Sequence, residues 1–153
     1  MMSIHVRLEK QRLNAAVELD ELTRAAAGDG GIVTFLGLAR NTSHSGEAVE
    51  KLVLDYHPRL TLASLEQIAS DAAARFKVSH VRVVHRCGDI QPCEAIVFAG
   101  VAAVHRRAAF EAADYLMDRL KTEAVFWKRE VGPSGSKWIE PTEADHTDRD
   151  RWG

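Results

Sequence analysis

The chain has 153 residues, of which 46% are hydrophobic and 27% are charged, and its formal net charge is −2 at pH 7. These values are typical of a globular domain with its own core, so we expect residues 1–153 to form a single domain. A slightly acidic chain lacks the broad basic surface that binds nucleic acid, and no apolar run is long enough to cross a membrane. With no signal peptide in the first residues, the sequence predicts a cytoplasmic protein without nucleic-acid or membrane partners.

Apolar residues spaced by two predict strands, and those spaced by three or four predict helices. Glycine and proline mark where several of these patterns stop. In chain order, the sequence predicts a strand over 4–8, a helix over 13–24, strands over 32–38 and 49–56, a helix over 58–76, strands over 78–87 and 95–104, a helix over 105–121, and strands over 124–131 and 137–139. About three helices and several strands, at least two of them in an antiparallel hairpin, indicate the α+β class with a mixed or antiparallel sheet.

Two of these elements carry specific predictions about burial. Residues 32–38 are apolar and rich in β-formers, so we expect a well-buried strand that ends near Arg40. The helix over 13–24 is expected to turn its apolar residues inward, namely Leu13, Val17, Leu19 and Leu22.

Two polar segments carry predictions about order. Residues 41–47 are polar and contain a glycine, which predicts a mobile loop. Residues 141–153 are acidic and polar apart from Trp152, so they predict a mobile tail.

The two cysteines are too few for a disulfide scaffold, and their spacing fits no zinc site. Cys87 ends an apolar strand pattern, so we expect it to be packed, whereas Cys93 lies in a turn. The histidines share no metal-ligand spacing either. The sequence therefore predicts neither a metal nor a cofactor.

The segment over 105–130 concentrates the charged groups that can carry chemistry. His105, Arg106 and Arg107 open the predicted helix, where free backbone N–H groups favour an anion. From these residues alone, an anion site at His105 and Arg106 and plain solvent exposure are equally good interpretations. For Arg107 we favour exposure, with a loose pair to Glu111 one turn further on.

Lys121 closes the predicted helix, and by itself a lysine there is expected to neutralise the helix C-terminus. In the strand that follows, Lys128 and Glu130 alternate with Trp127 and Arg129. We interpret Phe126 and Trp127 as core residues, because aromatic residues on a strand are usually buried. His85 and Arg86 precede a turn glycine, and we interpret them as a structural pair that orders the turn.

Six motifs, in a fixed order over roughly 30–139, resemble one known family, the catalytic (large) subunit of molybdopterin synthase. Each motif is weak alone, but the ordered set is specific. The motifs are TFLGLAR (34–40), LVLDYHP (52–58), HRCGDI (85–90), HRRAAF (105–110), DRLK (118–121) and FWKRE (126–130).

The resemblance implies an α/β hammerhead-type fold and a homodimer that forms the core of a heterotetramer. A small ubiquitin-like sulfur-carrier subunit binds at each outer end, and its C-terminal Gly-Gly thiocarboxylate enters the pocket of the large subunit. The carrier's sulfur is transferred to cyclic pyranopterin monophosphate, and two transfers form the dithiolene of molybdopterin. The expected function is therefore that of a sulfurtransferase in molybdenum cofactor biosynthesis.

The resemblance also implies residue roles. Arg40, His105 and Arg106 match positions that form an anion pocket for the pterin phosphate near the dimer interface. Lys121 matches the lysine beside the incoming carrier terminus, and Lys128 with Arg129 and Glu130 matches a second cluster that lines the substrate site. Lys121 and Lys128 are the expected catalytic residues, and all seven of these residues are expected to bind substrate: Arg40, His105, Arg106, Lys121, Lys128, Arg129 and Glu130.

This chemistry explains why no catalytic cysteine is needed, since the partner supplies the nucleophile. The large subunit positions the reactants, neutralises charge and moves protons. Two alternatives remain open from the sequence: a non-catalytic module that binds a phosphorylated ligand, and one that docks the tail of a ubiquitin-like protein. A metal-dependent hydrolase is disfavoured because the ligand residues are missing.

Overall fold

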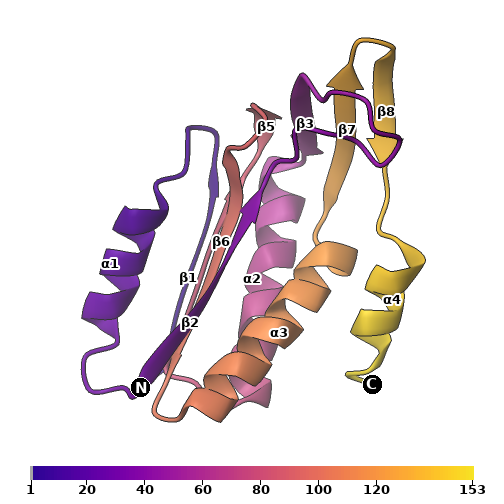
Figure 1. Cartoon of the computed structure of the whole chain (residues 1–153). Helices are drawn as coiled ribbons and strands as arrows, with labels where there is room; N and C mark the ends of the chain where they lie inside the picture. Colours follow the sequence, from indigo (N-terminus) through magenta and orange to yellow (C-terminus); the bar gives the residue numbers. More distant parts are fainter. Residues whose placement is uncertain (1) are drawn as a thin grey trace.

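The computed structural model describes residues 2–153, which form eight strands and four helices (Figure 1). Their bounds are β1 Ser3–Glu9, α1 Ala15–Ala25, β2 Gly31–Leu38, β3 Lys51–Tyr56, α2 Pro58–Arg75, β4 His80–Arg86, β5 Gly88–Ile90, β6 Ala95–Ala103, α3 Arg106–Glu123, β7 Phe126–Gly132, β8 Gly135–Ile139 and α4 Glu143–Asp150.

The strands form two four-stranded sheets, which confirms the predicted α+β class. The first sheet has the order β1-β4-β6-β2 and is mixed, since β1 pairs with β4 in parallel and the other pairs are antiparallel. The second has the order β5-β3-β7-β8 and is antiparallel throughout. Helices α2 and α3 cover one face of the first sheet and α1 covers the other, so the main core lies between this sheet and the α2–α3 pair (Figure 1).

Residues 32–38 form a strand as predicted, but the prediction that this strand is well buried was wrong. β2 forms where expected, but it is an edge strand that pairs only with β6. The side chains of Phe35, Leu36 and Leu38 are 46%, 42% and 56% exposed. An apolar strand is buried only where another layer covers it, and within residues 2–153 the helices leave these three side chains partly uncovered.

The polar tail forms a fourth helix, one more than the sequence predicted. Thr142 caps α4, accepting from the Asp145 backbone N–H, while the Asp145 carboxylate accepts from the Thr142 N–H. This reciprocal pair satisfies two N–H groups at the start of the helix. Beyond the helix, Trp152 packs edge-on against Phe76 and Tyr115, with ring centroids 5.8 and 5.4 Å apart, and donates to Asp118 at 2.7 Å. This aromatic anchor, together with ion pairs from Arg149 and Arg151 to acidic side chains of α3, holds the tail on the α2–α3 pair.

In α1 the inner face is partly polar, which corrects the sequence prediction. Leu22 is buried as expected, but Val17 and Leu19 are 51% and 42% exposed. The position between them, Glu18, is only 3% exposed, because its carboxylate accepts hydrogen bonds from Arg7 of β1. A second arginine, from β4, contacts the same carboxylate, so an ion-pair cluster fixes α1 to the sheet.

The turn around the two cysteines matches the sequence interpretation and adds a short strand, β5. Cys87 is buried and Cys93 is exposed. Cys93 has a φ of 71°, which glycine adopts more easily than any residue with a side chain. Arg86 orders this turn as predicted, since its guanidinium donates to Glu94 at 3.1 Å and to the Asp89 carbonyl at 3.0 Å.

No helix within residues 2–153 is both long and apolar enough to cross a membrane.

Candidate active site

Lys121 and Lys128 come together although they lie on different elements. Lys121 is in the last turn of α3, and the chain then reverses direction and starts β7 at Phe126. On β7, Lys128 shares its face with Phe126 and Glu130, and it lies opposite Leu54 in the register with β3. The face of the second sheet that carries Lys128 is therefore turned toward the end of α3.

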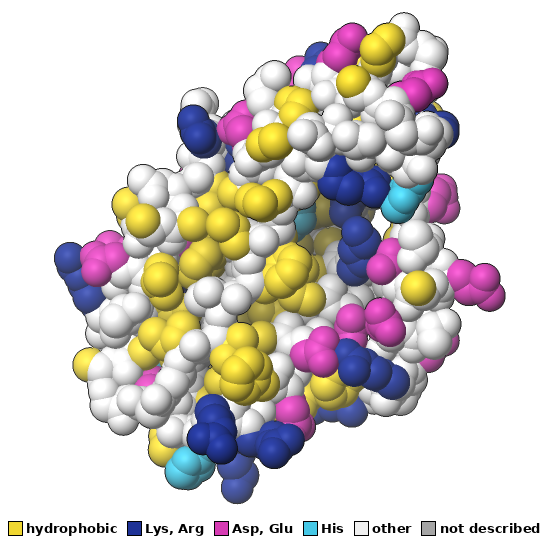
Figure 2. All heavy atoms as spheres, in the orientation of Figure 1, with side chains coloured by type: hydrophobic (Ala, Val, Ile, Leu, Met, Phe, Trp, Pro, Cys, Tyr) yellow, Lys and Arg dark blue, Asp and Glu magenta, His cyan; other side chains and the backbone are white. Residues whose placement is uncertain are grey.

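Three cavities meet at these two lysines. The polar cavity, of about 330 Å³, is lined by both lysines together with Arg40, His44, Glu130 and Asp145 among others. The apolar cavity, of about 210 Å³, shares Leu38 and Ile96 with the polar one and adds Phe35, Met117 and His85. A third, of about 140 Å³, lies between the end of α3 and residues 139–141. Figure 2 shows the hollow, with Lys and Arg side chains at its edge and the hydrophobic face of β2 and α3 beside it.

Lys128 is the lysine whose proton affinity the fold changes most. Burial and, after it, the positive charge of Lys121 lower its pKa from 10.5 to about 8, while Asp145 acts in the opposite direction. Removing an ammonium group from water disfavours its charged form, and a like charge nearby has the same effect. Near neutral pH a substantial fraction of Lys128 can therefore release its proton.

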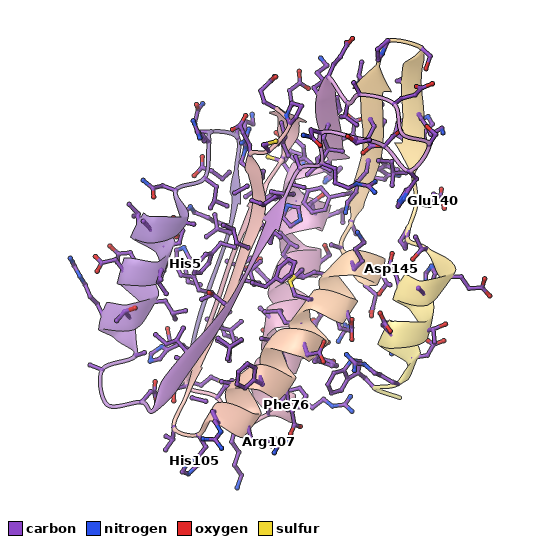
Figure 3. The ribbon with its side chains drawn as sticks, viewed as in Figure 1. His5, Phe76, His105, Arg107, Glu140 and Asp145 are labelled. Carbon is purple, nitrogen blue, oxygen red and sulfur yellow. The ribbon has the colours of Figure 1, made fainter. Side chains whose placement is uncertain are left out.

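Asp145 brings a carboxylate to the lysines from α4 (Figure 3). Partial burial raises its pKa, but the hydrogen bonds with Thr142 and the charges of Lys121 and Lys128 outweigh this and lower it. Asp145 thus stays ionised and partly neutralises the site.

Arg40 extends the cationic wall of the polar cavity. Its guanidinium lies 3.4 Å from a carboxylate oxygen of Glu130, which is only 9% exposed, and 3.0 Å from the ring of His44. His44 belongs to the polar loop over 41–47. This loop is held by the Thr42–Ala48 bridge and by a 2.6 Å hydrogen bond from Ser134 to Glu47. The mobility predicted for it stays a prediction.

His85 also lines the site, which the sequence interpretation missed. Its ring stacks on Phe126, with centroids 4.3 Å apart and planes 26° apart, and its Nδ1 lies 2.7 Å from the Arg86 carbonyl oxygen. The alternation along β4 could have revealed it, since Val81, Val83 and His85 share the face that turns toward α2 and α3.

His105 and Arg106 do not reach these cavities within one chain. Arg106 begins α3 and Lys121 lies fifteen residues further on, which is roughly 22 Å along a helix axis. Figure 3 shows His105 at the opposite end of the molecule from Glu140. Arg107 is exposed, as predicted, but no ion pair joins it to Glu111 within residues 2–153. The expected grouping of Arg40 with His105 and Arg106 is thus absent from the single chain.

Arg129 and Trp127 face away from the lysines, which corrects two predictions. They lie on the other face of β7, where Arg129 is 3.7 Å from Asp55 and Trp127 is 52% exposed. Arg129 therefore does not line the site as expected, and Trp127 is not a core residue. Phe126 is half-buried and packs against the main core, as predicted.

The site offers cations and one carboxylate-rich wall, but no cysteine or serine lines any of the three cavities among the described residues. Over the same residues, no group of three or more His, Cys, Asp or Glu side chains is placed to hold a metal ion. The arrangement suits the binding of anions and proton transfer to a reactant whose nucleophile comes from elsewhere.

Comparison with known proteins places this geometry in a family. The model of the MoaE protein family matches residues 8–123. The chain belongs to the MoaE family. The molybdopterin synthase catalytic subunit of Caulobacter vibrioides is 52% identical over 123 residues, which are 80% of each chain.

Solved structures agree with this membership. The MoaE protein of Burkholderia ambifaria has a TM-score of 0.81 and 32% identity, and the match covers 100% of this chain and 99% of the other. A complex of subunits 1 and 2 of molybdopterin-converting factor from Helicobacter pylori contains a chain with the same fold, with a TM-score of 0.72, 18% identity and 90% coverage of each chain.

Membership in the MoaE family makes the chain an enzyme of molybdopterin synthesis, of the catalytic-subunit kind. The three cavities around Lys121 and Lys128 provide charged groups and proton donors.

Proposed function

We propose that this chain transfers sulfur from the thiocarboxylated C-terminus of a small ubiquitin-like carrier to cyclic pyranopterin monophosphate, forming the dithiolene of molybdopterin. The observation that carries the proposal is the pair Lys121 and Lys128 at the meeting point of three cavities that contain no nucleophilic cysteine or serine. Such a site can bind two reactants and act on a sulfur that one of them brings.

The two lysines have different tasks. Lys121 is exposed, and it lies where a carrier terminus can enter, so its ammonium stabilises the thiocarboxylate and the negative charge that develops during attack. Lys128 is more buried, with a pKa of about 8, so it can give or accept a proton near neutral pH. As the sulfur attacks the pterin side chain, the cyclic phosphate opens and its oxygen takes the electron pair of the broken C–O bond. The carrier's acyl group is then joined to the pterin through sulfur. Water then releases the carrier as a carboxylate and leaves the sulfur on the pterin.

Phosphate recognition is assigned to Arg40 together with His105 and Arg106 of a second copy of the chain. A guanidinium group matches phosphate oxygens through two parallel hydrogen bonds. In one chain, Arg40 lies in the polar cavity, 3.4 Å from Glu130 and 3.0 Å from the ring of His44, whereas Arg106 is exposed about one helix length away. The site is therefore incomplete without a partner copy.

The surface that supports a homodimer is the apolar face of β2 beside the start of α3 (Figure 2). Exposed apolar side chains of this size on one edge strand favour burial against another protein surface. The face adjoins the apolar cavity through Phe35 and Leu38, so a second copy placed there closes the site. The exposed side chains of this surface are Phe35, Leu38, Val104 and Phe110, whereas Leu36 points to the opposite face of β2.

The carrier subunit completes the proposed heterotetramer, with one carrier for each copy of this chain. The Helicobacter pylori complex, which contains two different subunits and a chain of this fold, supports such an assembly. A cytoplasmic location, as predicted from the sequence, belongs to the same proposal.

The test is a single-turnover assay with purified protein, thiocarboxylated carrier and cyclic pyranopterin monophosphate. We expect dithiolene formation by the wild type and a loss of about 100-fold or more in Lys121→Ala, because a positioned charge is removed from the reacting centre. Lys77→Ala is the matched control, since Lys77 is an exposed lysine outside the three cavities. Binding of pterin and carrier by the wild type without any product would leave a binding module and refute the proposal.

A further inference from the structure

His85 is held in one orientation by contacts on two sides. Its ring stacks on Phe126, and its Nδ1 lies 2.7 Å from the carbonyl oxygen of Arg86. A carbonyl oxygen can only accept, so Nδ1 carries the proton and donates it. The side chain is 5% exposed, and what remains open faces the apolar cavity.

This hydrogen bond leaves the second ring nitrogen, Nε2, with a free lone pair. Burial lowers the pKa of His85 to about 4, and the charge of Lys128 acts in the same direction, so the ring is neutral at working pH. Within residues 2–153, no group donates a hydrogen bond to Nε2. A fixed, neutral acceptor without a donor in a nearly buried position favours a ligand that supplies one.

The chemistry of the apolar cavity defines that ligand. Its walls are aliphatic, aromatic and thioether side chains, among them Phe35, Ile96 and Met117, and its polar rim holds Lys121 and Lys128, which donate when they are protonated. Apart from the weakly accepting thioether and the amine of Lys128 when it is deprotonated, Nε2 of His85 is the only side-chain acceptor among the described residues that line the cavity. A complementary ligand thus has an apolar, flat body, acceptors or negative charge toward the lysines, and an N–H group toward His85.

We propose that His85 is a substrate-binding residue whose Nε2 accepts a hydrogen bond from an N–H group of the pterin ring and so fixes its orientation beside Lys121 and Lys128. The inference rests on the proposed function and adds a recognition residue for the heterocycle itself. A pterin carries ring N–H and amino donors, and its fused rings fit between apolar walls. Recognition by one buried acceptor discriminates strongly against heterocycles without the donor, because Nε2 then stays unpaired.

The carrier's C-terminal peptide fits the apolar cavity less well. Each peptide unit needs a donor for its carbonyl as well as an acceptor for its N–H. Beyond the two lysines at the rim, no side chain that lines this cavity can donate, since the only other polar group, His85, has its single N–H bonded to Arg86. The polar cavity offers a further donor in Thr142 and is the better place for the tail.

Two substitutions distinguish the roles of the two ring nitrogens of His85. His85→Asn keeps a donor near the Nδ1 position, which can still bond the Arg86 carbonyl, but removes the acceptor at Nε2. His85→Gln places an amide oxygen near the Nε2 position and gives up the Nδ1 donor. We would measure the dissociation constant of cyclic pyranopterin monophosphate by calorimetry with the full chain, and in parallel that of the carrier and the melting temperature.

We expect His85→Asn to weaken pterin binding about tenfold, His85→Gln to stay within about threefold of wild type, and carrier affinity to stay unchanged in both. The proposal is overturned if His85→Asn binds pterin as wild type does, if His85→Gln loses as much as His85→Asn, or if carrier affinity falls in place of pterin affinity. Because these experiments measure dissociation constants, they test the role of His85 in binding independently of product formation. Failure of the wild type to form product would refute the proposed function instead.

A measurement on the wild type keeps the test independent of how the variants fold. With ¹⁵N-labelled histidine, the Nε2 resonance of His85 reports an unbonded lone pair in the free protein. When the pterin binds, this ¹⁵N resonance should shift as expected for a ring nitrogen that accepts a hydrogen bond. An unchanged resonance at saturating pterin would contradict the proposal.

Discussion

Lys121 and Lys128 line the same three cavities from two different elements, so two like charges face one space. Burial and this repulsion together hold the pKa of Lys128 at about 8, and Asp145 offsets them only in part. A shift from 10.5 to about 8 corresponds to roughly 3 kcal/mol against the charged form, at about 1.4 kcal/mol per pKa unit. The fold thus maintains a lysine that is easily deprotonated, at a cost in stability.

Replacing Lys121 by Met should raise the pKa of Lys128. Removal of the neighbouring positive charge makes protonation of Lys128 easier, and burial alone then keeps its pKa below 10.5. We expect the midpoint to move upward by several tenths of a unit or more. NMR titration of ¹³C-labelled lysine side chains measures it directly, and Lys121→Arg, which keeps the charge, should leave the midpoint near 8. A midpoint that does not rise in Lys121→Met would show that the two charges are not coupled.

Two inactive variants should restore activity when they share a dimer. If the site combines Lys121 of one copy with Arg106 of the other, a mixed dimer of Lys121→Ala and Arg106→Ala chains contains one intact site and one doubly altered site. After unfolding and refolding of an equal mixture, half of the dimers are mixed, so we expect about one quarter of wild-type turnover.

The control for this experiment is an equal mixture of Lys121→Ala with Lys128→Ala, refolded in the same way. Lys121 and Lys128 line the same cavity of the same chain. Every site in the mixed dimer therefore still has one of the two lysines replaced, and turnover should not recover. Recovery in neither mixture would place Arg106 outside the shared site.

Trp152→Ala should release α4 from the rest of the molecule. The indole contacts Phe76 and Tyr115 and donates to Asp118, so its loss removes the aromatic anchor of the helix. We expect a loss of about 2 kcal/mol in the free energy of unfolding and faster amide hydrogen exchange across α4. Trp138→Ala is the control, because Trp138 is 62% exposed and should change stability by less than about 0.5 kcal/mol. Equal effects of the two substitutions would refute the anchoring role.

Glu18→Gln should lower the free energy of unfolding and should make that free energy less dependent on pH in the acid range. The hydrogen bonds from Arg7 and Arg82 lower the pKa of Glu18, although burial acts against them. A lowered pKa means that the ion pairs stabilise the fold above the ordinary pKa of glutamate and lose this effect as pH falls through the lowered value.

Because the carboxylate is almost fully buried, we expect Glu18→Gln to cost about 2–4 kcal/mol at pH 7 in urea unfolding. The difference from wild type should shrink toward pH 3. Asp20→Asn, which alters an exposed pair with Arg24, is the control and should cost less than about 0.5 kcal/mol. A pH-independent difference for Glu18→Gln would contradict the ion-pair explanation.

Local patterns predicted the elements well because their causes are local. Pro58 opens α2 as expected, and the switch from helical to alternating spacing after Lys121 marks the end of α3. The capping box of Thr142 and Asp145 was also visible in the sequence, yet the tail was interpreted as mobile. Its helix needs Trp152 to pack on Phe76, a contact across 76 positions that no local pattern shows.

By itself, the sequence determined the α+β class, the order of the elements, the family resemblance and the two lysines, since these depend on residue type and spacing. Only the tertiary structure decided which side chains share a space. It joined His85 and Asp145 to Lys121 and Lys128 and left Arg106 at the far end of α3. The physical reason is that register and helix packing set side-chain direction over distances much longer than the few residues that a pattern spans.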